Sequence, residues 1–265
     1  MTTLNSVPSG LLSTVDATGT LNIQTNSVNA LAIDTNQNAT MNYVSAQNTF
    51  GFKNRIINGA MVIDQRNNGA SVTFTNGQYI VDRWQAYQNT TGSFTVGQST
   101  SAPVGFNNSL LVTITSAATS LGTNFSIIRQ YVEGYNIADL NWGTANAKTI
   151  TLSFWVKSSA TGTFTGVLQN GNNDYAYGYT YTINSANTWE QKTITVTGPT
   201  SGTWGTTNGR GIDLDFCLAS ATGLTAGSWV TNGGGGNYYY GAPGQTNLFA
   251  NNGATFYITG VQLEK

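Results

Sequence analysis

The chain has 265 residues with a formal net charge of −1, and only 8% of them are charged, against roughly 25% in an average soluble domain. It has no basic surface of the kind that nucleic acid needs, and its apolar runs are far shorter than the ~20 residues of a spanning helix. The sequence has no histidine and one cysteine, which excludes histidine-based catalysis, paired-thiolate zinc sites and internal disulfides. We therefore expect neither a nucleic-acid partner nor membrane insertion, and no cofactor.

Two related phrases stand near the start of the chain, Leu-Asn-Ile-Gln-Thr-Asn from Leu21 and Leu-Ala-Ile-Asp-Thr-Asn from Leu31. Their period-2 alternation predicts strands. Two such units cannot bury their own apolar face and need neighbours. We expect residues 1–51 to form a β-repeat arm, in which Leu21, Ile23, Leu31 and Ile33 serve oligomerisation or attachment. The alternative is an edge hairpin that lies on the main domain.

From residue 52 onward, short alternating segments are separated by clusters of Gly, Asn and Ser, without a helical period. This pattern is typical of a sandwich or jelly roll. We predict an all-β fold, with a jelly-roll β-sandwich over residues 52–265 preceded by the short β-rich arm. One helical turn is expected at residues 136–141. The expected strands are residues 55–63, 79–87, 93–98, 109–115, 124–132, 149–157, 163–169, 175–183, 189–197, 212–219, 245–249 and 254–263.

Several phrases of the second region carry a family resemblance. They are NRIINGAM (54–61), IDQR (63–66), YIVDRW (79–84), TITLSFWVK (149–157), TWE (188–190), QTNL (245–248) and FYITGVQLE (256–264). In order and spacing they resemble the jelly-roll domains of bacteriophage tail-fibre and other virion-surface proteins, which in turn resemble carbohydrate-binding modules. The first fifty residues resemble the short repeats that precede such domains in phage fibres.

The resemblance implies a non-enzymatic protein of the virion surface that forms a homo-oligomer, with a trimer expected. Such a protein decorates or cements the capsid or forms a short fibre, and its partners are other capsid or tail proteins. Its outward jelly roll would bind host-surface glycans. Family members often continue beyond the Gln-Leu-Glu phrase, whereas this chain ends at Lys265, which favours a small capsid-decorating protein. The alternative is a tail-fibre receptor-binding protein that recognises host carbohydrate.

Aromatic residues supply the candidates for contact with a glycan or a partner. Strand alternation places four tyrosines on one face of residues 175–183, where they could stack on sugars or pack in a core or interface. Trp204 lies between glycines and is expected to be exposed, and three consecutive tyrosines in a loop cannot all point inward. Trp84, Trp155 and Trp189 are expected in the core. The contact candidates are Tyr175, Tyr177, Tyr179, Tyr181, Trp204, Trp229, Tyr238, Tyr239 and Tyr240.

Asp213 and Asp215 alternate with Leu214 and Phe216, so both carboxylates share one face of a strand. Such a pair could bind calcium or cleave a glycoside. The alternative is a pair of aspartates that face solvent or bind arginine. Because no second acidic cluster is evident, we expect no catalytic residue and no metal site. Cys217 is expected to be a small buried or half-buried hydrophobe.

Overall fold

The computed structural model describes residues 5–7, 10–12, 21–25, 28–33, 35–36, 39–41, 54–122, 124–221, 223–231 and 240–265. By its internal contacts the chain divides into two compact units, Met1–Phe52 and Lys53–Lys265. Within the described ranges, no helix is long and apolar enough to span a bilayer.

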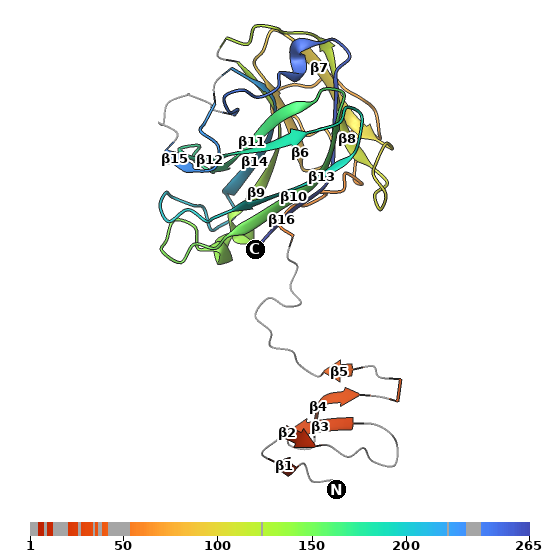
Figure 1. The fold of residues 1–265 in the computed structure, drawn as a ribbon, viewed down its shortest axis with the longest axis vertical. Coiled ribbons are helices and arrows are strands. Elements are labelled where there is room, and N and C mark those ends of the chain that lie inside the picture. The colour runs from red at the N-terminus through yellow and green to blue at the C-terminus, as the bar shows by residue number, and fades with distance from the viewer. Residues whose placement is uncertain are drawn as a thin grey trace. The chain divides into compact units, whose positions relative to one another are not determined.

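The larger unit is an all-β sandwich of two antiparallel sheets, which confirms the predicted fold class (Figure 1). One sheet has six strands in the order β15-β12-β11-β14-β9-β6, and the other has five in the order β13-β10-β16-β8-β7. The strands are β6 (Trp84–Gln88), β7 (Ser93–Ser99), β8 (Ser109–Ser116), β9 (Phe125–Glu133), β10 (Ile150–Ser158), β11 (Gly162–Asn170), β12 (Tyr175–Ile183), β13 (Glu190–Val196), β14 (Arg210–Ser220), β15 (Trp229–Thr231) and β16 (Thr255–Glu264).

The core lies between the two sheets and follows from the period-2 alternation of the strands. In β10, Leu152, Phe154 and Val156 are buried, while Trp155 and Lys157 point the other way and are half-buried. The Phe154 ring of the five-stranded sheet meets the Phe216 ring of the six-stranded sheet edge-on, with centroids 5.0 Å apart. Buried apolar side chains of this kind contribute about 1.5–3 kcal/mol each before ordering costs.

The strand β14 is buried on both of its faces. Its inner face packs in the core, and segments that follow it in sequence cover its outer face, which is the face turned away from the five-stranded sheet. There Tyr240 packs against Cys217 and Ile127, and Leu224 packs against the neighbouring β11. The side chains of Asp213 and Asp215, on the outer face of β14, are therefore withdrawn from water.

Two of the expected strands are wrong, and the strand expected at residues 79–87 begins only at Trp84, because the chain turns at Arg83 with φ 75°. Helical structure appears near the predicted turn. Residues 55–63 form turns, because Asn58 and Met61 adopt positive φ and the Asn58 side chain binds both the N–H and the C=O of Ile63. Residues 245–249 lead into the 3₁₀ helix η3 (Leu248–Ala250), which the Asn247 side chain caps. The helical turn is present as η1 (Gly134–Asn136) and η2 (Ala138–Leu140).

The smaller unit contains short antiparallel strands, which confirms a β-rich N-terminal arm. They are β1 (Asn5–Val7) with β2 (Gly10–Leu12), and β3 (Leu21–Thr25), β4 (Val28–Ile33) and β5 (Ala39–Met41) in a three-stranded sheet. In the register of that sheet, Leu21 lies opposite Ile33 and Ile23 lies opposite Leu31. The four predicted assembly positions are thus cross-strand neighbours, and their role in assembly stays a prediction.

Candidate functional site

The tyrosine stripe of β12 divides into two halves. Tyr179 and Tyr181 are 2% and 5% exposed and lie in the core, where they belong to the packing alternative. Tyr175 and Tyr177 lie at the start of the strand, next to the short edge strand β15, and are half-buried. Only this first half of the stripe therefore has surface to offer to a ligand.

Tyr175 and Tyr177 join three indoles in what we call the aromatic cluster: Tyr175, Tyr177, Trp142, Trp204 and Trp229. Trp229 stands at its centre, parallel to Tyr175 with an interplanar angle of 7° and a centroid distance of 5.8 Å. Trp142 and Trp204 meet it edge-on, each at 5.3 Å. Both arrangements are favoured by the quadrupoles of the rings. Tertiary packing has thus assembled residues from loops and strands far apart in the sequence.

Hydrogen bonds and one glycine hold the aromatic cluster in place. The indole N–H of Trp229 donates to Thr197 O at 2.7 Å, and that of Trp142 donates to Lys148 O at 2.8 Å. Gly202 has φ +88°, and a Cβ there would lie 3.0 Å from the Tyr175 ring, so a glycine is needed for the loop to pass. The half-buried rings are therefore fixed before any ligand arrives.

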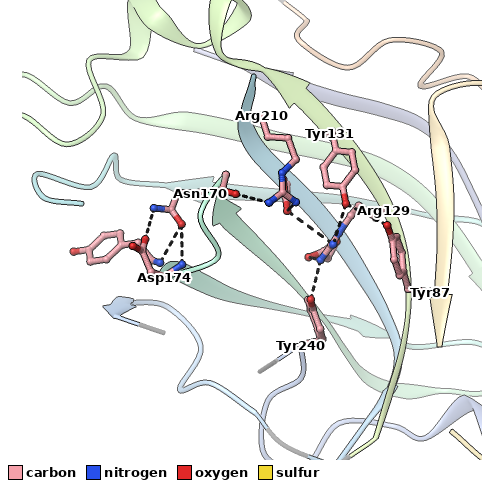
Figure 2. Close-up of polar contacts among 11 residues, drawn as sticks. Tyr87, Arg129, Tyr131, Asn170, Asp174, Arg210 and Tyr240 are labelled. Atoms are coloured by element: carbon pink, nitrogen blue, oxygen red, sulfur yellow. Dashed lines mark hydrogen bonds and ion pairs between the residues drawn. The ribbon is translucent and has the colours of Figure 1, made fainter. Parts of the chain in front are cut away.

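A polar turn between β11 and β12 borders the aromatic cluster. Asn170 organises it: its side-chain carbonyl accepts from the N–H groups of Asp174 and Tyr175, each at 3.1 Å. Its amide donates to Asp174 Oδ1 at 2.5 Å and to Thr203 O at 2.9 Å. Figure 2 shows Asn170 and Asp174 at this turn, beside the strands that carry the arginines.

The outer face of the six-stranded sheet carries a second group, which we call the arginine cluster: Tyr87, Arg129, Tyr131, Arg210, Asp213, Asp215 and Tyr240. Figure 2 labels its tyrosines and arginines. Arg129 donates from Nε to Asp215 Oδ1 at 2.5 Å and from Nη2 to Asp215 Oδ2 at 2.9 Å. Its Nη2 also donates to the Tyr240 hydroxyl at 3.0 Å. Three tyrosine rings surround the guanidinium, with centroids 5.3–5.5 Å from Cζ.

Asp213 has the more unusual environment of the two aspartates. Its Oδ2 accepts from Arg210 Nη1 at 3.0 Å, but its buried Oδ1 has no partner among the described residues. Burial raises the pKa of this carboxyl to about 7, and the repulsion of Asp215 adds to the shift, while Arg129 and Arg210 act against it. Its cross-strand neighbour Gln169 is fully buried, and its amide also lacks a partner among the described residues.

This geometry disfavours both chemistries that two aspartates could offer. Each side chain has 0% exposure, and Arg129 holds Asp215 by a bidentate pair. A glycosidase needs two carboxyls that flank a bound substrate. Here the two carboxyls are buried, and arginine side chains occupy the positions beside them. Across the described ranges, no group of three or more acidic or thiol side chains could hold a metal ion. The arrangement matches the arginine-paired alternative.

Several further expectations meet the structure in different ways. Cys217 is buried at 1% exposure, as predicted, and burial raises the pKa of its thiol to about 12. Trp204 is only 8% exposed, because two other indoles cover it, so its predicted exposure is wrong. Trp84 is in the core, but Trp155 and Trp189 are half-buried and lie outside it.

Of the three consecutive tyrosines, only Tyr240 belongs to the described residues. Tyr240 is buried and belongs to the arginine cluster, while Tyr238 and Tyr239 fall outside the described residues. Sequence reasoning missed Trp142, Arg129 and Tyr131. No local signal marks them, because each has a main partner more than sixty residues away in sequence: Trp204 for Trp142, Asp215 for Arg129 and Arg210 for Tyr131.

Comparison with known proteins gives likenesses of fold. No protein-family model and no curated protein matches the sequence. Among solved structures, the enzymatically active domain of tailspike protein 4 from bacteriophage CBA120 shares 14% identity over 80% of this chain, with a TM-score of 0.44. The alignment covers 21% of that tailspike chain.

Two carbohydrate-binding proteins are also similar. TmCBM61, solved in complex with beta-1,4-galactotriose, is 9% identical over 81% of this chain and 99% of its own, with a TM-score of 0.42. The family 11 carbohydrate-binding module of a Clostridium thermocellum cellulosomal cellulase is 13% identical over 74% of this chain and 95% of its own, with a TM-score of 0.36. At these identities the likeness concerns architecture and no site residue.

Proposed function

We propose that this chain is a non-enzymatic, glycan-binding protein of a bacteriophage virion surface. The aromatic cluster carries this proposal. Tyr175, Tyr177 and Trp229 offer half-buried rings that are already fixed, and rigid tyrosine and tryptophan rings supply large contact area at low entropic cost. At the polar turn beside these rings, Asn170 is buried and fully hydrogen-bonded, and the exposed Asp174 offers a carboxylate that could accept from sugar hydroxyls.

The virion location rests on the resemblance of the phrases in residues 54–264 to phage surface proteins. We propose a homo-oligomer, with a trimer expected, that decorates or cements the capsid or forms a short fibre. The absence of catalysis is proposed because arginine occupies the aspartate pair. The alternative is a tail-fibre receptor-binding protein. The copy number in purified particles distinguishes the two locations, because a capsid protein is far more abundant than a tail protein.

The test of glycan binding is an array of host-surface glycans probed with the full chain and with Trp229→Ala. We expect at least a tenfold loss of affinity in this variant, which corresponds to about 1.4 kcal/mol. Tyr135→Ala is the matched control, because Tyr135 is 69% exposed and lies outside the aromatic cluster. Equal binding by Trp229→Ala and the native chain would contradict the assigned site. Shortening of a host polysaccharide during incubation would contradict the non-enzymatic role.

A further inference from the structure

The outer face of the five-stranded sheet carries a group of rings around one cation. We call Trp155, Lys157, Trp189 and Tyr257 the lysine face. The Lys157 ammonium lies 4.1 Å from the Tyr257 ring centroid and 5.1 Å from that of Trp189. The two rings meet edge-on at 6.0 Å. Lys157 and Tyr257 are cross-strand partners in the register of β10 and β16, so the sheet itself sets this geometry.

Trp155 extends the lysine face along β10. Beside it the strand β16 bulges at Gly260, which has φ +62°, and a Cβ there would lie 2.6 Å from the Phe106 ring and 3.2 Å from the Trp155 ring. The bulge therefore lets a loop aromatic approach Trp155. On the other side, Trp155 lies opposite the exposed Gln191, and the exposed Thr193 follows one row further. The Trp155 ring is thus flanked by the neutral amide of Gln191 and the hydroxyl of Thr193.

Lys157 has no acidic partner among the described residues. Its Nζ donates to Ser101 Oγ at 2.7 Å, which leaves N–H groups of the ammonium for another acceptor. Glu190, which follows Trp189 in sequence, is paired with Lys192 at 2.6 Å. Glu264 lies opposite Thr151, six residues from Lys157 along β10 and thus about 20 Å away. Within this face, the two rings and Ser101 are therefore the partners of the Lys157 charge, and no carboxylate of the described residues balances it.

An ammonium group without a carboxylate partner, placed among half-buried rings, is an unusual feature in a chain with only 8% charged residues. Burial lowers the pKa of Lys157, which indicates that its present surroundings disfavour the charged form. An anion would restore that balance by a charge-assisted hydrogen bond. The rings suit the C–H faces of a sugar, and Gln191 and Thr193 suit its hydroxyls.

We propose that the lysine face is a second binding site, specific for an acidic sugar. The carboxylate or phosphate of the sugar would pair with Lys157, and its ring would lie on Trp155 or Trp189. This site is on the opposite sheet from the arginine cluster and shares no residue with the aromatic cluster. It therefore goes beyond the proposed function and fails or succeeds independently of it.

The experiment compares acidic glycans with their neutral parents on one array, at low and at high salt. Uronic-acid and sialylated glycans probe a carboxylate, and sugar phosphates probe a phosphate. The full chain should bind at least one acidic class at least tenfold more tightly than its parent, and high salt should weaken that binding. Lys157→Met, which keeps the apolar stem, should remove the preference, and Lys157→Arg should retain part of it.

Two controls separate the site from other causes. Lys148→Met removes an exposed ammonium that makes no ion pair within the described residues and keeps the backbone carbonyl that binds Trp142, so it should leave the preference unchanged. Trp229→Ala should keep the preference for acidic glycans even where it loses other glycans. Equal binding of acidic and neutral glycans, or an unchanged preference in Lys157→Met, would overturn the proposal. Binding to an acidic peptide but to no acidic glycan would also overturn it.

Discussion

At the scale of single residues, the arginine cluster shows how scarce charges are handled. Arg129, Asp213 and Asp215 are buried on the outer face of the six-stranded sheet, and the partly exposed Arg210 pairs with Asp213 at their border. Removing such charges from water costs several kcal/mol per ion, which pairing and hydrogen bonds must offset. Arg129 binds both oxygens of Asp215, although burial still raises the pKa of that carboxyl, while Asp213 is paired less fully because its Oδ1 lacks a partner among the described residues.

The raised pKa of Asp213 predicts how stability depends on pH. The folded chain holds this proton up to pH about 7, whereas the unfolded chain releases it near 3.8. Between these values the folded state binds more protons, so Asp213 lowers the free energy of unfolding as pH rises through that window. Asp213→Asn does not titrate. Between pH 4 and pH 8, the free energy of unfolding of Asp213→Asn should therefore rise by more than about 1 kcal/mol relative to that of the native chain, which is roughly the equivalent of one pKa unit.

Urea unfolding of both proteins across this pH range measures the effect. Glu190, whose pKa is lowered to about 2, provides the internal contrast. The stability that Glu190 contributes is present at neutral pH and is lost only as pH falls toward 2, whereas Asp213 acts between pH 3.8 and about 7. Parallel stability curves for the native chain and Asp213→Asn would show that the Asp213 carboxyl is charged throughout.

At the scale of elements, β12 shows one strand serving two environments. Its tyrosines alternate regularly, yet the covering sheet reaches only the second half of the strand. Tyr179 and Tyr181 are therefore enclosed, while Tyr175 and Tyr177 face the aromatic cluster. The two enclosed hydroxyls also differ: Tyr179 donates to Asp215 O at 2.7 Å, whereas Tyr181 has no partner among the described residues.

This difference predicts that two matched substitutions change the free energy of unfolding differently. Tyr179→Phe removes a buried hydrogen bond and should cost about 1 kcal/mol of the free energy of unfolding. Tyr181→Phe removes a buried hydroxyl that lacks a partner and should be neutral or stabilising. Each variant is the other's control, since both delete one oxygen from adjacent rings of the same strand face. Urea unfolding at neutral pH measures both, and equal losses would contradict the assignment of the two hydroxyls.

At the scale of the whole molecule, the sandwich and the arm are two separate compact units. The sandwich encloses its own core between two sheets. The arm has a three-stranded sheet in which the apolar positions Leu21, Ile23, Leu31 and Ile33 are cross-strand neighbours. A two-stranded hairpin is marginal by itself in water, and three strands need a buried apolar face to be stable alone. Burial against other copies would add about 1.5–3 kcal/mol per aliphatic side chain, and symmetry would repeat the gain in each subunit.

Deletion of residues 2–48 tests the assembly role of the arm. We expect the full chain to form a homo-oligomer and the truncated chain to be a folded monomer that no longer occupies phage particles. Light scattering measures the oligomer, and a particle-binding assay measures attachment. The double substitution Ile23→Asp with Leu31→Asp is a milder version and should give the same result. An unchanged oligomer after deletion would place the assembly contacts on the sandwich.

The sequence by itself determined the all-β class, most strands of the sandwich and the burial of Cys217, because alternation and turn residues are local signals. It failed at residues 55–63, where an Asn-Gly turn with positive φ overrides an apolar pattern. Only the tertiary structure decided which aromatic residues meet. Alternation assigns a side chain to a face, but what covers that face depends on pairing between distant strands. For that reason the structure divided the β12 stripe and brought Trp142 to Trp229. It also enclosed the two aspartates with Arg129 and left Lys157 among rings without an acidic partner in the described residues.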